Sequence, residues 1–373
     1  MQPRDLSGHV PYEAGRGNEE VARELGVDPG DLVVLSSNEN PYGPAPAAAE
    51  AIREGADGVG RYPKASHADL HAALSDRWDC ASEQVWLAPG GDGSLDYLHR
   101  ALLEPGDRIL VPEPGFAYYA MSARYHHGEV ATYPLRRADD FAQSADRVLD
   151  AYDGERIVFL ISPHSPTGSE VPLEEVAALA AGTDDDTLVV VDEAYGEFSA
   201  SPSAAELLDE RDDVAVLRTF SKAYGLAGLR VGYLLTPRSW AGAYARVNTP
   251  FAVNELGCRA ALAALDDEAH VERSVEGARW AREYMRAELD ARVWPSAGNF
   301  VLAAVGDGTA VAGAAEREGV LVRDTSSFGL PGCIRITCGT ETETRTAVET
   351  LNDVLADRDA PDPVEEAEPR PDA

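Results

Sequence analysis

The sequence contains very little lysine. Of the 32 lysines and arginines, only Lys64 and Lys222 are lysines. Arginine cannot replace a lysine that must lose its proton and attack a carbonyl carbon. A lone lysine is usually a solvated surface residue, but Lys222 lies among small and hydroxyl residues in the segment Thr219-Phe220-Ser221-Lys222-Ala223-Tyr224-Gly225. This setting makes Lys222 a candidate for covalent chemistry.

Positive charge is scarce overall. The 373-residue chain carries 65 acidic and 32 basic residues, which gives a formal net charge of -33 at pH 7. Such a surface repels the phosphates of nucleic acids and of anionic membranes, so we expect neither as a partner. The acidic side chains also repel one another unless salt screens their charges, and at 1 M salt the Debye length is about 3 Å. The composition therefore predicts a halophilic-type protein from a salt-rich cytosol.

Cysteines and long apolar runs are also few. Cys80, Cys258, Cys333 and Cys338 form no Cys-x-x-Cys pair, so we expect neither a disulfide framework nor a metal site. No stretch approaches the roughly 18 apolar residues of a membrane span, and the first residues lack the apolar core of a signal peptide. These absences predict a cytoplasmic protein.

Short apolar runs alternate with helical patterns along the first two thirds of the chain. This alternation is typical of an α/β fold in which helices cover both faces of a mostly parallel sheet. The predicted strands are Gln84–Ala88, Arg108–Pro112, Glu129–Tyr133, Arg156–Ser162, Thr187–Asp192, Val214–Thr219 and Leu229–Leu235. The predicted helices between them include Ser94–Leu103, Phe141–Tyr152 and Leu173–Ala181.

The pattern changes after about Phe251, where a smaller α+β unit is expected. Its predicted strands are Asn299–Val305, Val320–Arg323 and Cys333–Cys338. Its predicted helices are Glu255–Leu265, His270–Ala291, one between the first two of these strands, and Glu341–Leu355. We therefore expect an N-terminal arm that is part of the small domain (1–40), a large cofactor-binding domain (41–250), a small C-terminal domain (251–356) and an acidic disordered tail (357–373).

Polar and glycine-rich segments follow several predicted strands, at the edge where α/β sheets place their ligands. Ala88-Pro89-Gly90-Gly91-Asp92-Gly93-Ser94 precedes a helix whose N-terminus suits an anion, and Asp192 and Tyr195 follow a valine-rich run. Phe116, Lys222 and Arg230 follow other strands. Taken alone, each segment is more often a turn, a helix cap or a core aromatic than part of a ligand site. Together they are the parts that hold an aldehyde cofactor with a phosphate and a pyridine ring, which describes pyridoxal 5'-phosphate.

At these residues the chain resembles the pyridoxal-phosphate-dependent enzymes of the aspartate-aminotransferase fold (fold type I). Within them, from about Leu6 to Leu355, it is most similar to the histidinol-phosphate aminotransferases. The resemblance rests on five segments: Ser37-Asn38-Glu39-Asn40-Pro41-Tyr42-Gly43-Pro44, Arg61-Tyr62-Pro63, Val191-Asp192-Glu193-Ala194-Tyr195, Ser221–Arg230 and Arg335-Ile336-Thr337-Cys338-Gly339. It implies transamination between histidinol phosphate and 2-oxoglutarate, with glutamate as the other amine, in histidine biosynthesis.

The resemblance also implies roles for individual residues. Lys222 would hold the cofactor and move the substrate's proton, Asp192 would pair with the ring nitrogen, and Tyr195 would donate to the phenolic oxygen. Gly91, Asp92, Thr219, Ser221 and Arg230 would bind the phosphate, and Phe116 would stack on the ring. Tyr62 would reach the cofactor phosphate of a second subunit, which implies a homodimer with shared sites. Its alternative is a turn aromatic beside Pro63.

Substrate recognition would fall to four residues, Arg335, Arg323, Tyr12 and Asn38. Arg335 matches the arginine that grips a carboxylate, and Arg323 would help to bind the phosphate of histidinol phosphate. Tyr12 would reach in from the partner's arm or simply pack there. Other activities on the same scaffold stay open, namely aromatic amino-acid transamination and threonine-phosphate decarboxylation, as does a non-catalytic binding or regulatory protein.

One position departs from the family pattern. Relatives carry asparagine before Pro166-Thr167-Gly168, whereas this chain has Ser165. A serine hydroxyl donates one hydrogen bond and reaches less far than an amide, so Tyr195 or a water would have to compensate at the cofactor's phenolic oxygen. The adjacent His164 would either brace Asp192 or only fill space.

Overall fold

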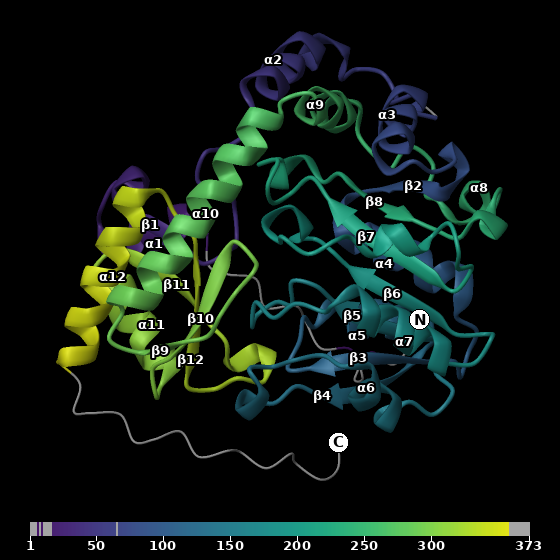
Figure 1. Cartoon of the computed structure of the whole chain (residues 1–373). Helices are drawn as coiled ribbons and strands as arrows, with labels where there is room; N and C mark the ends of the chain where they lie inside the picture. The colour runs from purple at the N-terminus through teal and green to yellow at the C-terminus, as the bar shows by residue number, and fades with distance from the viewer. Residues whose placement is uncertain (1–5, 7–8, 10–16, 65, 358–373) are drawn as a thin grey trace.

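The computed structural model describes residues 6, 9, 17–64 and 66–357, and its larger sheet has seven strands. Their order across the sheet is β2-β8-β7-β6-β5-β3-β4 (Figure 1). The strands are β2 (Val85–Ala88), β3 (Arg108–Glu113), β4 (Glu129–Pro134), β5 (Ile157–Ile161), β6 (Leu188–Asp192), β7 (Val214–Thr219) and β8 (Gly232–Leu235). Five of them, from β7 to β4, run parallel, and β8 is antiparallel to both its neighbours. The α/β class and all seven predicted strands are confirmed.

Both faces of this sheet are covered, which explains why its strands read as unbroken apolar runs. Along β5, Ile157 and Phe159 join one apolar cluster, whereas Val158 and Leu160 join another on the opposite face. The first cluster includes side chains of α4 (Gly90–Leu102) and α5 (Tyr118–Tyr125). The second includes side chains of α3 (Ala68–Trp78), α6 (Ala145–Ala151) and α7 (Leu173–Gly182). A short helix, α8 (Tyr244–Val247), follows β8.

Two predicted helix starts were wrong. The helix expected from Phe141 begins at Ala145, because Phe141 is fully buried with a φ of 58°, outside the right-handed helical region. The helix expected from Ser94 begins at Gly90, so the glycine-rich segment forms its first turn instead of a loop before it. Gly93 permits this tight entry, because a Cβ there would lie 2.5 Å from the ring of Pro89.

A second sheet has five strands in the order β1-β11-β12-β10-β9. They are β1 (Val33–Leu35), β9 (Arg292–Val293), β10 (Phe300–Ala304), β11 (Val320–Asp324) and β12 (Cys333–Thr337). β1 pairs in parallel with β11, and the other pairs are antiparallel. The N-terminal segment thus contributes an edge strand to a sheet built mainly from the end of the chain.

The remaining helices lie in two places, some beside this second sheet and the others next to α3 of the larger unit (Figure 1). They are α1 (Asn18–Leu25), α2 (Pro46–Gly55), α9 (Glu255–Leu265), α10 (Glu268–Glu288), α11 (Gly308–Arg317) and α12 (Glu341–Ala356). α9 packs on α2 and α3, whereas the long α10 continues to the second sheet and to α12. The domain limits expected from the sequence stay a prediction.

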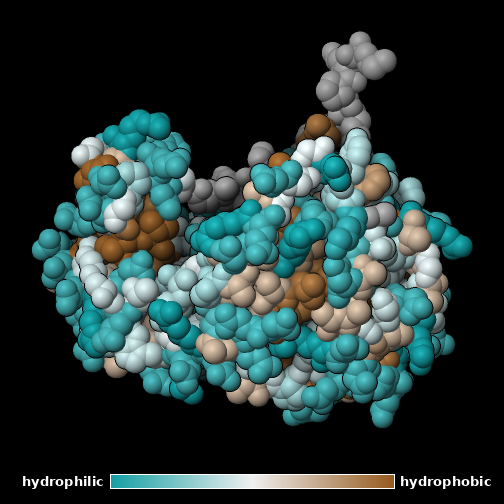
Figure 2. Space-filling model, turned by 90° about the horizontal axis from the view of Figure 1, so that it is seen from above, coloured by the Kyte–Doolittle hydropathy of each residue, from teal (hydrophilic) through white to brown (hydrophobic). Residues whose placement is uncertain are grey.

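The face of the molecule seen in Figure 2 is largely hydrophilic, with apolar side chains gathered in a few places between the hydrophilic ones. In the described part of the chain, no helix is both long and apolar enough to cross a membrane. All four cysteines have free thiols, and Cys258, Cys333 and Cys338 are buried.

Candidate active site

A cavity of about 430 Å³ lies where the carboxyl ends of β5, β6 and β7 face the second sheet. Segment 36–39, the N-terminus of α4 and two arginines of β11 and β12 complete its wall. Thirteen of the fifteen predicted site residues line it: Asn38, Gly91, Asp92, Phe116, Ser165, Asp192, Tyr195, Thr219, Ser221, Lys222, Arg230, Arg323 and Arg335. The fold therefore brings together residues that lie almost 300 positions apart in the sequence.

Lys222 enters the cavity from the loop that follows β7. Its Nζ lies 3.4 Å from the backbone oxygen of Ser37 and 5.6 Å from the centroid of the Tyr195 ring. Gly225 anchors the loop with a φ of 67°, and a Cβ there would lie 2.1 Å from the backbone oxygen of Gly43. The loop that carries Lys222 is thus fixed against the N-terminal segment, and the amine of Lys222 faces the ring of Tyr195.

Asp192 ends β6 with its carboxylate buried. The hydroxyl of Tyr119 donates to its Oδ2 at 2.6 Å, and the Ala194 amide donates to Oδ1 at 2.9 Å. Burial raises the pKa of Asp192 to about 6, although both hydrogen bonds oppose that rise. The sequence reasoning missed Tyr119. Its signal was its position three residues after Phe116, in the segment that follows β3, and both side chains line the cavity.

Tyr195 is buried beside two cations. Burial by itself raises the pKa of its hydroxyl, but the charges of Lys222 and Arg335 outweigh this effect and hold the pKa below 10. The amide of Asn38 donates to the hydroxyl at 2.9 Å, and a hydrogen bond with Ser165 lowers the pKa further. The backbone N–H of Asn38 donates to Oγ1 of Thr337 at 2.9 Å, which fixes the position of Asn38. The surroundings of Tyr195 favour negative charge on an oxygen.

The N-terminus of α4 and Arg230 form a cradle for an anion. Nη2 of Arg230 lies 3.0 Å from Oδ2 of Asp92, and the hydroxyl of Thr219 lies 2.9 Å from that of Ser221. Gly90 has a φ of 80°, and a Cβ there would lie 2.5 Å from Nη2 of Arg230. Free amides at a helix N-terminus, a guanidinium and two hydroxyls together suit a phosphate.

Arg335 and Arg323 face the other side of the cavity. They are paired directly across β12 and β11, which places both guanidinium groups over the ring of Phe328, each at 5.5 Å. Arg335 donates to the hydroxyl of Ser165 at 3.1 Å and to the backbone oxygen of Ser36 at 2.9 Å. The Ser165 hydroxyl and the Ser36 carbonyl are uncharged acceptors, and a guanidinium that lines a cavity suits an anionic ligand.

One predicted residue, Tyr62, does not line the cavity. The side chain of Tyr62 is exposed, and its ring lies 4.9 Å from that of Phe251. Tyr12 lies outside the described residues. His164 does not brace Asp192 by hydrogen bonding, since its Nδ1 pairs with the hydroxyl of Thr167 at 2.8 Å. Tyr119 takes that bracing position instead.

Comparisons with known proteins agree with this geometry. The sequence model described as aminotransferase class I and II matches residues 30–351. Among curated proteins, the chain is similar to the histidinol-phosphate aminotransferases of two halophilic archaea. It is 69% identical to that of Natronomonas pharaonis over 95% of this chain and 100% of the relative, and 64% identical to that of Haloferax volcanii over 96% and 99%.

Solved structures show the same likeness. A histidinol-phosphate aminotransferase from Sinorhizobium meliloti, in complex with pyridoxal-5'-phosphate, superimposes with a TM-score of 0.84 at 28% identity, over 95% of this chain and 98% of that one. An aspartate aminotransferase from Thermus thermophilus in complex with maleate gives 0.81 at 23% identity, which supports the fold alone. On its motifs, its fold and its relatives, this chain belongs to the class I and II aminotransferase family.

Proposed function

We propose that this protein is a pyridoxal-phosphate-dependent transaminase that exchanges the amino group between histidinol phosphate and 2-oxoglutarate. One observation carries the proposal: a single cavity holds Lys222, the buried carboxylate of Asp192 and two paired arginines. The relatives named histidinol-phosphate aminotransferase, at 69% and 64% identity over nearly the whole chain, support this substrate.

The residues present fit pyridoxal phosphate. Asp192 is buried with a raised pKa, so its carboxylate gains from a protonated ring nitrogen beside it. Tyr195 lies where an anionic oxygen is stabilised by Lys222 and Arg335. Gly90 leaves room for the fork of Arg230 beside the helix N-terminus, as a phosphate cradle requires. A pyridine ring between these groups would contact Phe116.

When bound, the cofactor supplies an electron sink for the carbon that loses its proton. Lys222 would hold the cofactor and then carry that proton from carbon to carbon as a general base and acid. Asp192 would keep a proton on the ring nitrogen, and Tyr195 with Ser165 would donate to the phenolic oxygen. Thr219, Ser221, Arg230 and the backbone of Gly91 and Asp92 would orient the group through its phosphate.

The two paired arginines suit the two substrates. Arg335 would bind the carboxylate of glutamate with a planar fork, and Arg323 would add a second fork when the ligand is the dianionic phosphate of histidinol phosphate. Because the chain carries a net charge of -33, these groups act as local positive sites in a repelling field. Asn38 would shape the same end of the cavity through its contact with Tyr195.

We also propose a homodimer with shared active sites. Tyr62 is 82% exposed and forms a surface aromatic pair with Phe251, which is 50% exposed. Large exposed aromatic side chains that contact each other on a surface are typical of protein interfaces. A second copy would cover them and bring Tyr62, together with the arm that carries Tyr12, towards the neighbouring site. The cytoplasmic location expected from the sequence stays a prediction.

A single-turnover experiment tests the activity. The purified protein, loaded with pyridoxal phosphate, should convert its visible band to that of the amine form when histidinol phosphate is added. Phenylalanine and threonine phosphate serve as comparison substrates. A faster reaction with phenylalanine, or carbon dioxide release from threonine phosphate, would contradict the proposed substrate.

Borohydride reduction tests the role of the lysine. Reduction should fix the cofactor on the peptide that contains Lys222, and Lys64→Arg should leave this labelling unchanged, because the Lys64 ammonium is held on the surface by Asp69 at 2.6 Å. Lys222→Arg should abolish it. Labelling that survives in Lys222→Arg would contradict the assignment.

A further inference from the structure

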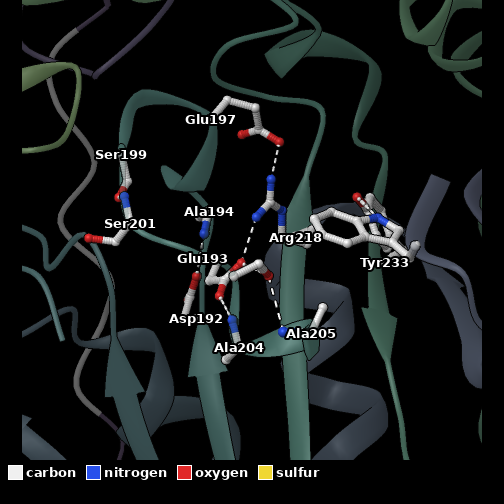
Figure 3. A network of polar contacts seen from close by, with 12 residues as sticks. Asp192, Glu193, Ala194, Glu197, Ser199, Ser201, Ala204, Ala205, Arg218 and Tyr233 are labelled. Carbon is white, nitrogen blue, oxygen red and sulfur yellow. Dashed lines mark hydrogen bonds and ion pairs between the residues drawn. The ribbon is translucent and has the colours of Figure 1, made fainter. Parts of the chain in front are cut away.

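A buried ion cluster of Glu193, Glu197 and Arg218 lies at the carboxyl ends of β6 and β7, close to Asp192 (Figure 3). Asp192 and Thr219 line the cavity, whereas their neighbours Glu193 and Arg218 do not, because successive side chains along a strand point to opposite sides. Nη1 of Arg218 lies 2.6 Å from Oε2 of Glu193, and Nη2 lies 2.5 Å from Oε1 of Glu197. The three side chains are only 5–6% exposed. One guanidinium thus connects the end of β6, the end of β7 and the 3-10 turn Gly196–Phe198.

The surrounding residues fix this cluster tightly. The indole of Trp78 lies 4.7 Å from the guanidinium carbon of Arg218, and its N–H donates to the hydroxyl of Tyr233 at 3.0 Å. Gly196 cannot carry a side chain, because a Cβ there would lie 2.4 Å from Nη1 of Arg218. On the far side, Oε1 of Glu193 accepts from the Ala204 amide at 2.7 Å.

Stability alone does not account for such a cluster. It holds two carboxylates and one guanidinium out of water, and the desolvation of buried ion pairs commonly cancels their attraction, so well-packed apolar side chains would serve a core at least as well. What apolar side chains cannot supply is a planar fork that fixes two acceptors in definite directions. The cluster therefore sets geometry more than it adds free energy.

We propose that Arg218, Glu193 and Glu197 are positioning residues that hold the carboxyl ends of β6 and β7 in register, so that Asp192 and Lys222 keep their spacing across the cavity. The inference rests on the proposed function. Glu193 directly follows Asp192, and Arg218 precedes Lys222 by four residues along the same strand and loop. The backbone joins the same two strand ends, since the Glu193 amide donates to the Leu217 carbonyl at 2.9 Å.

A displacement on the order of 1 Å at a reacting centre costs roughly a hundredfold in rate. The charged and titratable groups around Asp192 are Tyr119 from α5, Asp92 from α4 and the adjacent Glu193. Only Glu193 is tied to Arg218. Loosening the cluster would therefore displace the end of β6, which carries Asp192, while the contacts of Asp192 with α4 and α5 remain.

The test compares two conservative variants of the loaded enzyme, Arg218→Lys and Arg211→Lys. Arg211 is the matched control, because it also binds a carboxylate with two nitrogens, at 2.7 and 2.5 Å from Asp213, but beside the opposite end of β7. Lysine keeps the charge and loses the fork. The readouts are the melting temperature, kcat and the pH midpoint of the visible band of the cofactor on Lys222.

We expect both variants to melt at lower temperature, and only Arg218→Lys to change the site. Its kcat should fall by about tenfold to a hundredfold. The pH midpoint of the visible band should rise by about half a pH unit. A displaced Asp192 would stabilise the proton on the ring nitrogen less well, and the nitrogen that joins Lys222 to the cofactor would then lose its proton only at higher pH. Glu197→Gln, an isosteric change, should shift the midpoint in the same direction by less.

An Arg218→Lys protein with a lower melting temperature but an unchanged midpoint would overturn the inference, as would an equal shift in Arg211→Lys. If Arg218→Lys does not fold, Glu197→Gln decides, and an unchanged midpoint there overturns it as well. The band does not depend on which amine is the substrate. A wild-type protein that forms no band would instead contradict the proposed function itself.

Discussion

The hydrogen bond between Tyr119 and Asp192 gives a quantitative prediction for the cofactor-free protein. Asp192 titrates near pH 6 in the folded chain and near its ordinary value of 3.8 when exposed. Between these values the folded state retains a proton that the unfolded state has lost, so the free energy of unfolding falls as the pH rises. The difference of about two pH units corresponds to about 3 kcal/mol.

Tyr119→Phe should enlarge this effect. Its hydroxyl lies 2.6 Å from the buried carboxylate, and a hydrogen bond to a charged group contributes about 1.5–3 kcal/mol. Without that bond the pKa of Asp192 should rise further, by about one to two pH units. The variant should therefore lose about 1.5–3 kcal/mol more stability at pH 9, where the carboxylate is ionised, than at pH 5, where it is protonated.

Urea unfolding at both pH values and constant salt measures this difference. Tyr133→Phe is the control, because Tyr133 is also buried but its hydroxyl has only uncharged acceptors within reach, Oε1 of Gln143 at 2.9 Å and the backbone oxygen of Phe159 at 2.8 Å. Its loss of stability should be the same at both pH values. If the losses of Tyr119→Phe and Tyr133→Phe change equally with pH, the carboxylate of Asp192 is not the group that Tyr119 stabilises.

Two further predictions concern the cofactor link and the charge of the surface. In Ser165→Asn, an amide donor should reach the cofactor's phenolic oxygen and lower the pH midpoint of the visible band relative to wild type, so an unchanged or higher midpoint would contradict the reading of Ser165 as a weaker donor. Thermal melting should occur at higher temperature in molar KCl than in dilute buffer, because salt screens the repulsion within a chain of net charge -33. Equal melting temperatures would rule out a salt requirement.

Local patterns in the sequence were enough to predict the seven strands of the larger sheet, but they did not predict β1, β9 or the helices α2 and α3. The strands were recognisable because side chains buried on both faces must be apolar along the whole run, as in Val214–Thr219, which the structure reproduces without change. The motif around Lys222 was recognisable because a reactive lysine, small neighbours and a following arginine lie within nine residues. Helix starts were less predictable, because the start of α4 depends on how closely Gly93 approaches Pro89.

The sequence by itself thus determined the strands, the charge and the reactive lysine, since each depends on residue type and local spacing. Only the tertiary structure decided which side chains meet. Tyr119 reaches Asp192 across 73 positions, and Arg323 faces Arg335 because β11 and β12 pair in that register. Arg218 looked like one more residue of an apolar strand, until the fold placed two carboxylates within reach of its fork. Such partners depend on which strands become neighbours, and no local pattern of residues specifies that choice.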